Sequence, residues 1–186
     1  MASKKIKVLT PYFRASFLNV FKPRAPFEGK PPVYSVQMLF PKEADLGPLK
    51  KAALELIVEK WGSDKTKWPK GLRLPFKSGD EKNLENYKGM TVLECRSKQK
   101  PGLVNQKRED IIDETEIYSG CWMRATVTPF IYDVQGNRGV SFGLNSLQKV
   151  KDDTAFSGRS NAKDDFEELE ELNDVDSVDL NSEIDF

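Results

Sequence analysis

Residues 121–144 read CWMRATVTPFIYDVQGNRGVSFGL, and this stretch decides the fold class. Apolar and polar side chains alternate along its first half, which is typical of a β-strand with one buried face. The segment 133–138 contains the Gly and Asn that favour a tight hairpin turn. The sequence therefore predicts two neighbouring strands, at residues 117–132 and 139–144.

Three further strands and one helix are predicted on the N-terminal side of this hairpin. The strands are expected at residues 6–21, 33–40 and 90–97, where β-forming residues or alternating side chains occur. Residues 46–61 instead carry apolar side chains at helical spacing, with Asp45 placed to cap the helix and Gly62 to end it. The segments rich in Gly, Pro and Lys are interpreted as long loops, at residues 22–32, 62–88 and 98–116.

This order of elements fits a small Greek-key barrel. We predict a mainly β protein with an OB-fold-like barrel, one main helix and long loops over residues 1–156. After Val150 the chain is dominated by Ser, Asn, Asp and Glu. Such a segment cannot bury enough apolar surface to offset its ordering entropy. Residues 157–186 are therefore predicted to be a disordered acidic tail.

The net charge of zero conceals two oppositely charged regions. Residues 1–151 hold 27 basic and 16 acidic side chains, whereas residues 152–186 hold 2 basic and 13 acidic ones, so the regions carry +11 and −11. A basic body suits a polyanionic ligand, and an acidic segment suits a role in interactions. The alternative is that these charges serve solubility alone.

Several classes of protein are disfavoured. The chain has no histidine, so the commonest general base and metal ligand is missing. Cys95 and Cys121 lack the paired spacing of a zinc or redox site and are interpreted as free, buried thiols. No apolar run approaches the roughly 18 residues that span a bilayer, and the first ten residues do not resemble a signal peptide. We expect a cytoplasmic, non-enzymatic protein with no cofactor, metal or membrane partner.

The alternation along residues 117–132 separates two faces. Cys121, Met123, Ala125, Val127 and Ile131 are assigned to the core. The opposite face combines three aromatics with an arginine, which is the chemistry that stacks bases and binds phosphate. The alternative is that these aromatics pack beneath the helix or the loops. The residues predicted on this face are Trp122, Arg124, Thr126, Thr128, Phe130 and Tyr132.

Two further stretches combine cations with aromatic or glycine residues, at 60–77 and 96–108. Both suit the phosphate backbone of a nucleic acid. The alternative for both is a solvated loop with one tryptophan in the core. The complete set of predicted DNA-binding residues is Arg14, Lys67, Trp68, Lys70, Arg73, Lys98, Lys100, Lys107, Arg108, Trp122, Arg124, Phe130, Tyr132 and Arg138.

A run of carboxylates in residues 109–116 raises the alternative of a two-metal nuclease. A nuclease needs carboxylates that converge on a metal from fixed elements, whereas this run has the composition of a solvated loop. We therefore predict no catalytic residues.

Short strings spread along most of the chain resemble the OB-fold single-stranded DNA-binding proteins of tailed phages. Their order also matches, and the resemblance implies sequence-independent binding of single-stranded DNA in phage replication, recombination and repair, in the bacterial cytoplasm. The acidic tail is longer than this family leads one to expect. The matching strings are NVFKPR (19–24), YSV (34–36), FPK (40–42), SGDEK (78–82), SK (97–98), KPG (100–102), YSGC (118–121), GLN (143–145), QKV (148–150), GRS (158–160) and DDF (164–166).

The chain ends in EIDF, residues 183–186, an apolar tip on an acidic segment. This resembles the aromatic C-terminus that T7-type phage single-stranded DNA-binding proteins present to their replication partners. The resemblance implies that Asp179, Glu183, Asp185 and Phe186 bind phage or host replication proteins. The alternative function is a replication adaptor that binds nucleic acid only weakly.

Overall fold

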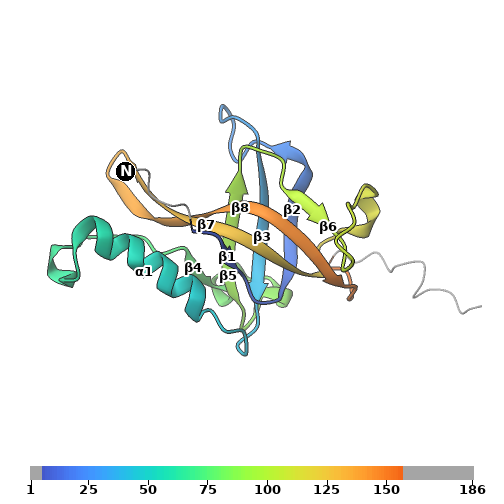
Figure 1. Cartoon of the computed structure of the whole chain (residues 1–186), viewed down its shortest axis with the longest axis horizontal. Helices are drawn as coiled ribbons and strands as arrows, with labels where there is room; N and C mark the ends of the chain where they lie inside the picture. The colour runs from blue at the N-terminus through green and yellow to red at the C-terminus, as the bar shows by residue number, and fades with distance from the viewer. Residues whose placement is uncertain (1–5, 157–186) are drawn as a thin grey trace, which may run out of the picture.

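A single eight-stranded sheet dominates the computed structural model, which describes residues 6–156 (Figure 1). The strands are β1 (Val8–Leu9), β2 (Phe13–Arg24), β3 (Val33–Phe40), β4 (Phe76–Ser78), β5 (Thr91–Ser97), β6 (Gly102–Val104), β7 (Trp122–Val134) and β8 (Asn137–Lys151). The helix α1 covers Gly47–Trp61, and four short 3-10 helices lie at Lys65–Lys67 (η1), Gly79–Lys82 (η2), Glu85–Tyr87 (η3) and Glu114–Glu116 (η4).

Five of the strands close into a barrel. β2 pairs with β3 and β3 with β5, both antiparallel, and β5 then pairs in parallel with β8. β8 is antiparallel to β7, and β7 returns to β2 where Met123 pairs with Phe13. This is the Greek-key strand order of an OB-fold, so the predicted fold class is confirmed.

The β7–β8 hairpin turns through Gln135 and Gly136, whose φ angles of 51° and 81° both lie in the left-handed region. Positive φ at both central residues is the requirement of a type I′ turn, whose twist matches that of the flanking strands. The predicted hairpin is confirmed. Both strands run closer to the turn than predicted, β8 also extends to Lys151, and in Figure 1 the hairpin projects beyond the barrel.

Cys121, just before β7, and the alternating residues Met123, Ala125 and Val127 of β7 are buried in the barrel core as predicted, and Ile131 is partly buried against it. The rings of Phe13 and Phe40 meet edge to face, with centroids 5.6 Å apart. Both cysteines are free and buried, as predicted. Burial raises the pKa of each thiol, which keeps both protonated and unreactive.

The predicted helix is confirmed as α1, which lies in the connection between β3 and β5 and packs against β7, β8 and β1. The Asp45 carboxylate accepts a hydrogen bond from the Gly47 amide at 2.9 Å, close to the start of the helix. Gly62 ends it with φ 87°, and its N–H donates to the Val58 carbonyl at 2.8 Å. No helix of the described part of the chain is long and apolar enough to cross a membrane.

Several predicted boundaries were wrong. Residues 6–21 are two strands, because the chain breaks at Pro11, which lacks an amide hydrogen for the ladder. Residues 117–121 are not a strand: the chain turns at Ser119 and Gly120, where the Gly120 φ is 117°, so β7 begins only at Trp122. β4 and β6 lie in segments predicted as loops, since strands of three residues are too short to show a period.

Candidate nucleic-acid interface

Two hollows adjoin on the outer face of β3 and β5. One has a volume of about 430 Å³ and the other about 220 Å³, and both are lined by Gln37, Glu94 and Arg96. These three residues alternate with the buried Val36, Met38, Leu93 and Cys95, so they point away from the core. We call the combined feature the groove.

The larger hollow is bounded by Arg73 and by Phe130 and Tyr132 of the β7–β8 hairpin. Backbone hydrogen bonds fix Arg73 against the hairpin: its N–H donates to the Arg138 carbonyl at 2.9 Å, and its carbonyl accepts from Val140 at 3.0 Å. Gly139 makes this close approach possible. A Cβ at that position would lie 2.5 Å from both the Arg73 carbonyl oxygen and the Tyr132 hydroxyl.

The smaller hollow is bounded by Phe17 of β2 and by Arg24, where β2 runs into the β2–β3 loop. The Phe17 side chain is 55% exposed. The groove therefore crosses the β3–β5 face between two projecting loops, the β2–β3 loop and the β7–β8 hairpin.

The groove is strongly cationic. Its one acidic lining residue, Glu94, already forms an ion pair with Arg96 at 3.0 Å. Exposed guanidinium and ammonium groups beside exposed rings suit a ligand that offers both phosphates and flat bases. The cations that line it are Arg24, Arg73, Lys77, Lys82 and Arg96.

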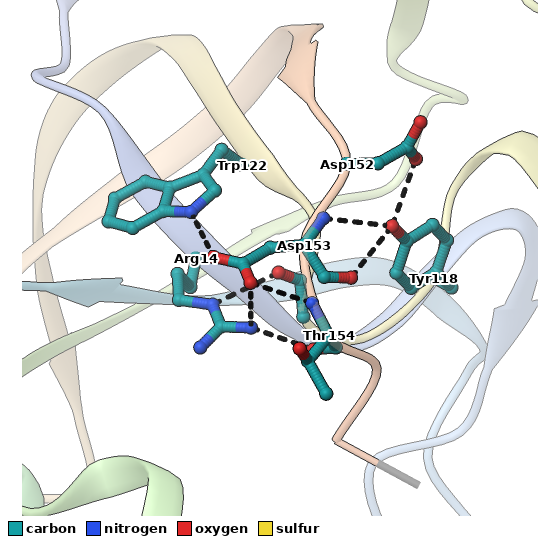
Figure 2. A network of polar contacts seen from close by, with 7 residues as sticks. Arg14, Tyr118, Trp122, Asp152, Asp153 and Thr154 are labelled. Carbon is teal, nitrogen blue, oxygen red and sulfur yellow. Dashed lines mark hydrogen bonds and ion pairs between the residues drawn. The ribbon is translucent and has the colours of Figure 1, made fainter. Parts of the chain in front are cut away.

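A second group of basic and aromatic residues lies at the other end of β7, where the chain leaves β8 (Figure 2). We call residues 152–156 the strap. The Trp122 indole donates to the Asp153 carboxylate at 2.7 Å. Arg14 donates to the Gly120 and Thr154 carbonyls at 3.0 and 2.7 Å. The Tyr118 hydroxyl lies 2.9 Å from the Asp152 carboxylate.

The strap is also held by backbone and apolar contacts. The Phe156 amide donates to the Ser119 carbonyl at 2.9 Å, and its ring packs on the small cluster around Leu39 and Tyr87. The Arg14 guanidinium lies 4.5 Å from the centre of that ring. A Cβ at Gly120 would collide with the Thr154 carbonyl, so only glycine lets the strap pass.

The surroundings of Asp153 in the strap favour the ionised form of its side chain. The Trp122 hydrogen bond, followed by the Thr154 amide and the nearby Arg14 and Lys151 charges, lowers the pKa of Asp153 below its usual value. Lys149 pairs with Asp152 at 2.8 Å. Burial is the main cause that raises the pKa of Tyr118 to about 12, so its hydroxyl stays protonated and available as a donor.

A third surface feature contains two of the predicted arginines. Arg108 and Arg124 line a hollow of about 250 Å³ on the outer face of β7 and β8, together with Leu9. The Arg124 guanidinium donates to the Gln148 side chain at 2.7 Å. Neither arginine lines the groove.

The aromatics and arginine predicted to share one face of β7 are thus divided among three places. Phe130 and Tyr132 line the groove, Arg124 lies in the separate hollow, and Trp122 is bound to the strap. Register shifts after Trp122 and after Thr126 interrupt the long β7–β8 ladder. A twisted strand with such irregularities turns successive outward residues toward different surfaces.

The remaining predicted residues are dispersed. The Trp68 indole donates to the Gly62 carbonyl at 2.9 Å and its ring packs against the core, whereas Lys67 and Lys70 are exposed beside it. Lys98, Lys100 and Lys107 lie on exposed turns, and Arg138 pairs with Asp133 at 3.0 Å. The predicted tail residues lie outside the described residues, namely Asp179, Glu183, Asp185 and Phe186.

Sequence reasoning missed several residues that line the groove. For Gln37 and Arg96 the signal was present, because each alternates with core residues of its strand. For Phe17 the sequence carried no signal of an outward side chain, since an apolar residue inside a strand is ordinarily assigned to the core. Lys77 and Lys82 were indistinguishable from other loop cations. The missed residues are Phe17, Arg24, Gln37, Lys77, Lys82 and Arg96, although Lys77 and Arg96 belong to the stretches 60–77 and 96–108 that the sequence had singled out.

Within residues 6–156, no group of three or more Cys, Asp or Glu side chains is arranged to hold a metal ion. The carboxylates of residues 109–116 are exposed and follow an irregular loop and η4. Asp113 there accepts hydrogen bonds from the amide and the hydroxyl of Thr115, at 2.9 and 2.7 Å.

Comparison with known proteins gives consistent results. Residues 6–176 match the model of the family described as Enterobacter phage Enc34, ssDNA-binding protein. The solved structure of the single-stranded DNA-binding protein from bacteriophage Enc34 in complex with ssDNA is 28% identical, with a TM-score of 0.68 over 81% of this chain and 89% of that one. A putative protein p50 of Acyrthosiphon pisum secondary endosymbiont phage 1 is 29% identical over 90% of this chain and 94% of its own length.

The fold is shared more widely. The structure of gp2.5, a single-stranded DNA-binding protein encoded by bacteriophage T7, superposes with a TM-score of 0.60 at 18% identity. The match covers 93% of this chain and all of the T7 chain.

Proposed function

Because the chain belongs to the phage single-stranded DNA-binding family of the Enc34 protein, we propose that it binds single-stranded DNA in the groove, without reading its sequence. The observation that carries this proposal is the composition of the groove. Exposed aromatics and five cations face one acidic side chain, which is itself paired. The face and the two loops that border it are those with which OB-folds commonly bind oligonucleotides.

The two kinds of side chain have different roles in this proposal. Arg73, Arg96 and the neighbouring lysines contact phosphates, and Phe130 and Tyr132 stack on bases. Each stacked base contributes about 1–3 kcal/mol and tolerates any sequence, because every base has a flat π-face. The protein has no catalytic step in this role.

The test is a salt titration of oligo(dT) binding, followed by fluorescence anisotropy. Replacing Lys77 and Lys82 by alanine should weaken binding and reduce the salt slope by about 0.7 for each phosphate that is no longer neutralised. The matched control replaces Lys42 and Lys51, two exposed lysines that do not line the groove. Equal effects of the two double variants would show that only overall charge matters. Weak binding by the unmodified protein would favour an adaptor role.

The acidic C-terminal segment supports a second part of the proposal, autoregulation. The 11 acidic side chains of residues 157–186, which follow the strap, are tethered to a body of opposite charge, so they compete with DNA for basic sites at a high effective concentration. Deleting residues 160–186 should tighten oligonucleotide binding, most at low salt, because screening weakens such competition. Equal or weaker binding by the truncated protein would contradict it.

The same segment is proposed to recruit phage or host replication proteins through its aromatic end, in replication, recombination and repair. Phe186→Ala should impair recruitment, measured by pull-down of replication proteins from infected cells, and leave DNA affinity little changed. Loss of DNA affinity in this variant would contradict the separation of the two roles.

A further inference from the structure

Phe17 combines two unfavourable features. Its φ angle of 44° lies in the left-handed region, which bulky residues rarely adopt because their Cβ meets the backbone. Its ring is 55% exposed, although β2 is otherwise a core strand of the barrel. Strained residues of this kind persist where the surrounding structure enforces them, and they concentrate at ligand-binding sites.

The surrounding contacts show how the strain is enforced. Phe17 lies at an irregularity of the β2–β3 ladder, between the paired residues Ser16 and Asn19. The buried Ser16 hydroxyl lies 2.9 Å from the Tyr87 hydroxyl, and the Asn19 amide donates to Ser35 at 3.2 Å. Ser16 is thus fixed inward, whereas Asn19 and Ser35 line the smaller hollow together with the outward ring of Phe17.

The exposed Phe17 ring is held in place by a contact with the Tyr87 ring. Its centroid lies 6.5 Å from that of Tyr87, at an interplanar angle of 58°. The Tyr87 hydroxyl donates to the Gln37 side-chain oxygen at 2.6 Å, which orients the Gln37 amide. The Gln37 amide nitrogen has no hydrogen-bond partner among the described residues and borders the same hollow as Phe17.

We propose that the smaller hollow is a subsite for a single nucleobase, which stacks on Phe17 while its edge meets the Gln37 amide. The hollow has a volume of about 220 Å³, enough for one base, and Arg24 and Arg96 lie beside it to hold the flanking phosphates. The subsite extends the DNA path from the β7–β8 hairpin across β3 and β5 to β2. This inference rests on the proposed function of the groove.

The test replaces Phe17 by asparagine, which tolerates the left-handed region and cannot stack as an aromatic does. Affinity for oligo(dT) should fall between about 5-fold and 150-fold, the range that one stacked base contributes. The melting temperature should be unchanged or higher, because asparagine relieves the strain. Phe17→Trp should keep the affinity. The matched control is Tyr12→Asn, a similarly exposed aromatic (53%) that does not line the groove.

An oligomer of abasic residues separates stacking from charge. The unmodified protein should prefer oligo(dT) over the abasic chain, and Phe17→Asn should reduce this preference by the same factor that it reduces affinity for oligo(dT). An unchanged preference, or a lower melting temperature with unchanged affinity, would overturn the base subsite alone. If the unmodified protein binds neither oligomer, the proposed function of the groove fails as well.

Discussion

The groove and the strap site are built from the same kinds of residue, yet only one of them is open. In the groove, Arg73, Phe130 and Tyr132 have no covering acidic segment within residues 6–156. At the strap, Arg14 and Trp122 are bound by Asp153 and by backbone carbonyls of the chain itself. Among the cations of the groove, only Arg96 is paired within the described part of the chain, with the Glu94 carboxylate at 3.0 Å. We therefore expect the groove to bind nucleic acid more readily than the strap site, where the chain itself supplies the anion.

The strap contacts assign a structural role to two residues that the sequence suggested for DNA binding. Arg14 bridges β2, the turn at Gly120 and the strap, and Trp122 joins β7 to Asp153 (Figure 2). Together they fasten the last described residues to the barrel. This difference predicts that mutations in the groove change DNA affinity, whereas mutations at the strap change stability.

The largest effect is expected from removing both aromatics of the hairpin. The double variant Phe130→Ala, Tyr132→Ala should bind oligo(dT) about 100-fold more weakly or worse, since the stacking of two bases, roughly 1–3 kcal/mol each, is removed. The matched strap variant, Tyr118→Ala with Trp122→Ala, should leave affinity nearly unchanged. Anisotropy titrations of both proteins decide the comparison. A larger loss of affinity from the strap pair would reverse our assignment.

Arginine replacements should separate the two regions by a different measurement. Arg14→Ala should lower the free energy of unfolding by about 2–4 kcal/mol, because a largely buried guanidinium loses charged hydrogen bonds and its packing on the Phe156 ring. Arg73→Ala should change stability little, since its fixed contacts are made by its backbone. Urea denaturation and oligo(dT) affinity should rank the variants in opposite orders.

A smaller effect is expected from adding one methyl group to β8. Gly139→Ala should reduce affinity about 10-fold, because the new Cβ displaces the Tyr132 ring and the Arg73 backbone from the edge of the groove. Gly143→Ala is the matched control on the same strand, where the nearest atom to an added Cβ is the Thr128 carbonyl at 3.7 Å. If both variants bind alike, the contact at Gly139 does not shape the groove.

Local sequence signals predicted the fold better than the site. The alternation of Met123, Ala125 and Val127 and the turn at Gln135 and Gly136 depend on neighbouring residues, so they are visible in the chain itself. The closing pair of β5 with β8 joins residues far apart in sequence, so no local pattern shows it, and only the order of the elements, which fits a Greek-key barrel, predicted the closure.

The site depends on longer-range information. Arg14 and Asp153 are 139 positions apart, so nothing near Arg14 in the sequence shows that its charge is already bound. The bulge that turns Phe17 outward is likewise set by pairing with β3 and by the Tyr87 network, neither of which has a local pattern. The residue types in the sequence indicated that cationic and aromatic side chains would be present. Which of them are exposed together on one surface is determined by the fold.

The smallest effect, and the one most specific to the strap, concerns a single charge. Asp153→Asn keeps the size of the side chain and removes the carboxylate that Trp122 and Arg14 bind. The variant should be less stable than the unmodified protein at neutral pH. Glu59→Gln is the control, because Glu59 is an exposed carboxylate of α1 with no ion-pair partner in residues 6–156.

The pKa of Asp153 determines how the difference in stability between the two proteins changes with pH. The pKa of Asp153 in the folded protein lies below the usual 3.8, so the ionised form is the one that the strap stabilises. The Asp153 carboxylate therefore contributes fully to the free energy of unfolding above pH 3.8. This contribution is lost as pH falls through the lower pKa that Asp153 has in the folded protein. Urea denaturation curves of Asp153→Asn and the unmodified protein should differ at neutral pH and converge in strong acid.

Oligo(dT) affinity should be the same for both proteins at neutral pH, because the strap lies outside the groove. A clear rise in affinity of the variant would instead mean that Asp153 competes with DNA, and the two regions would form one regulated surface.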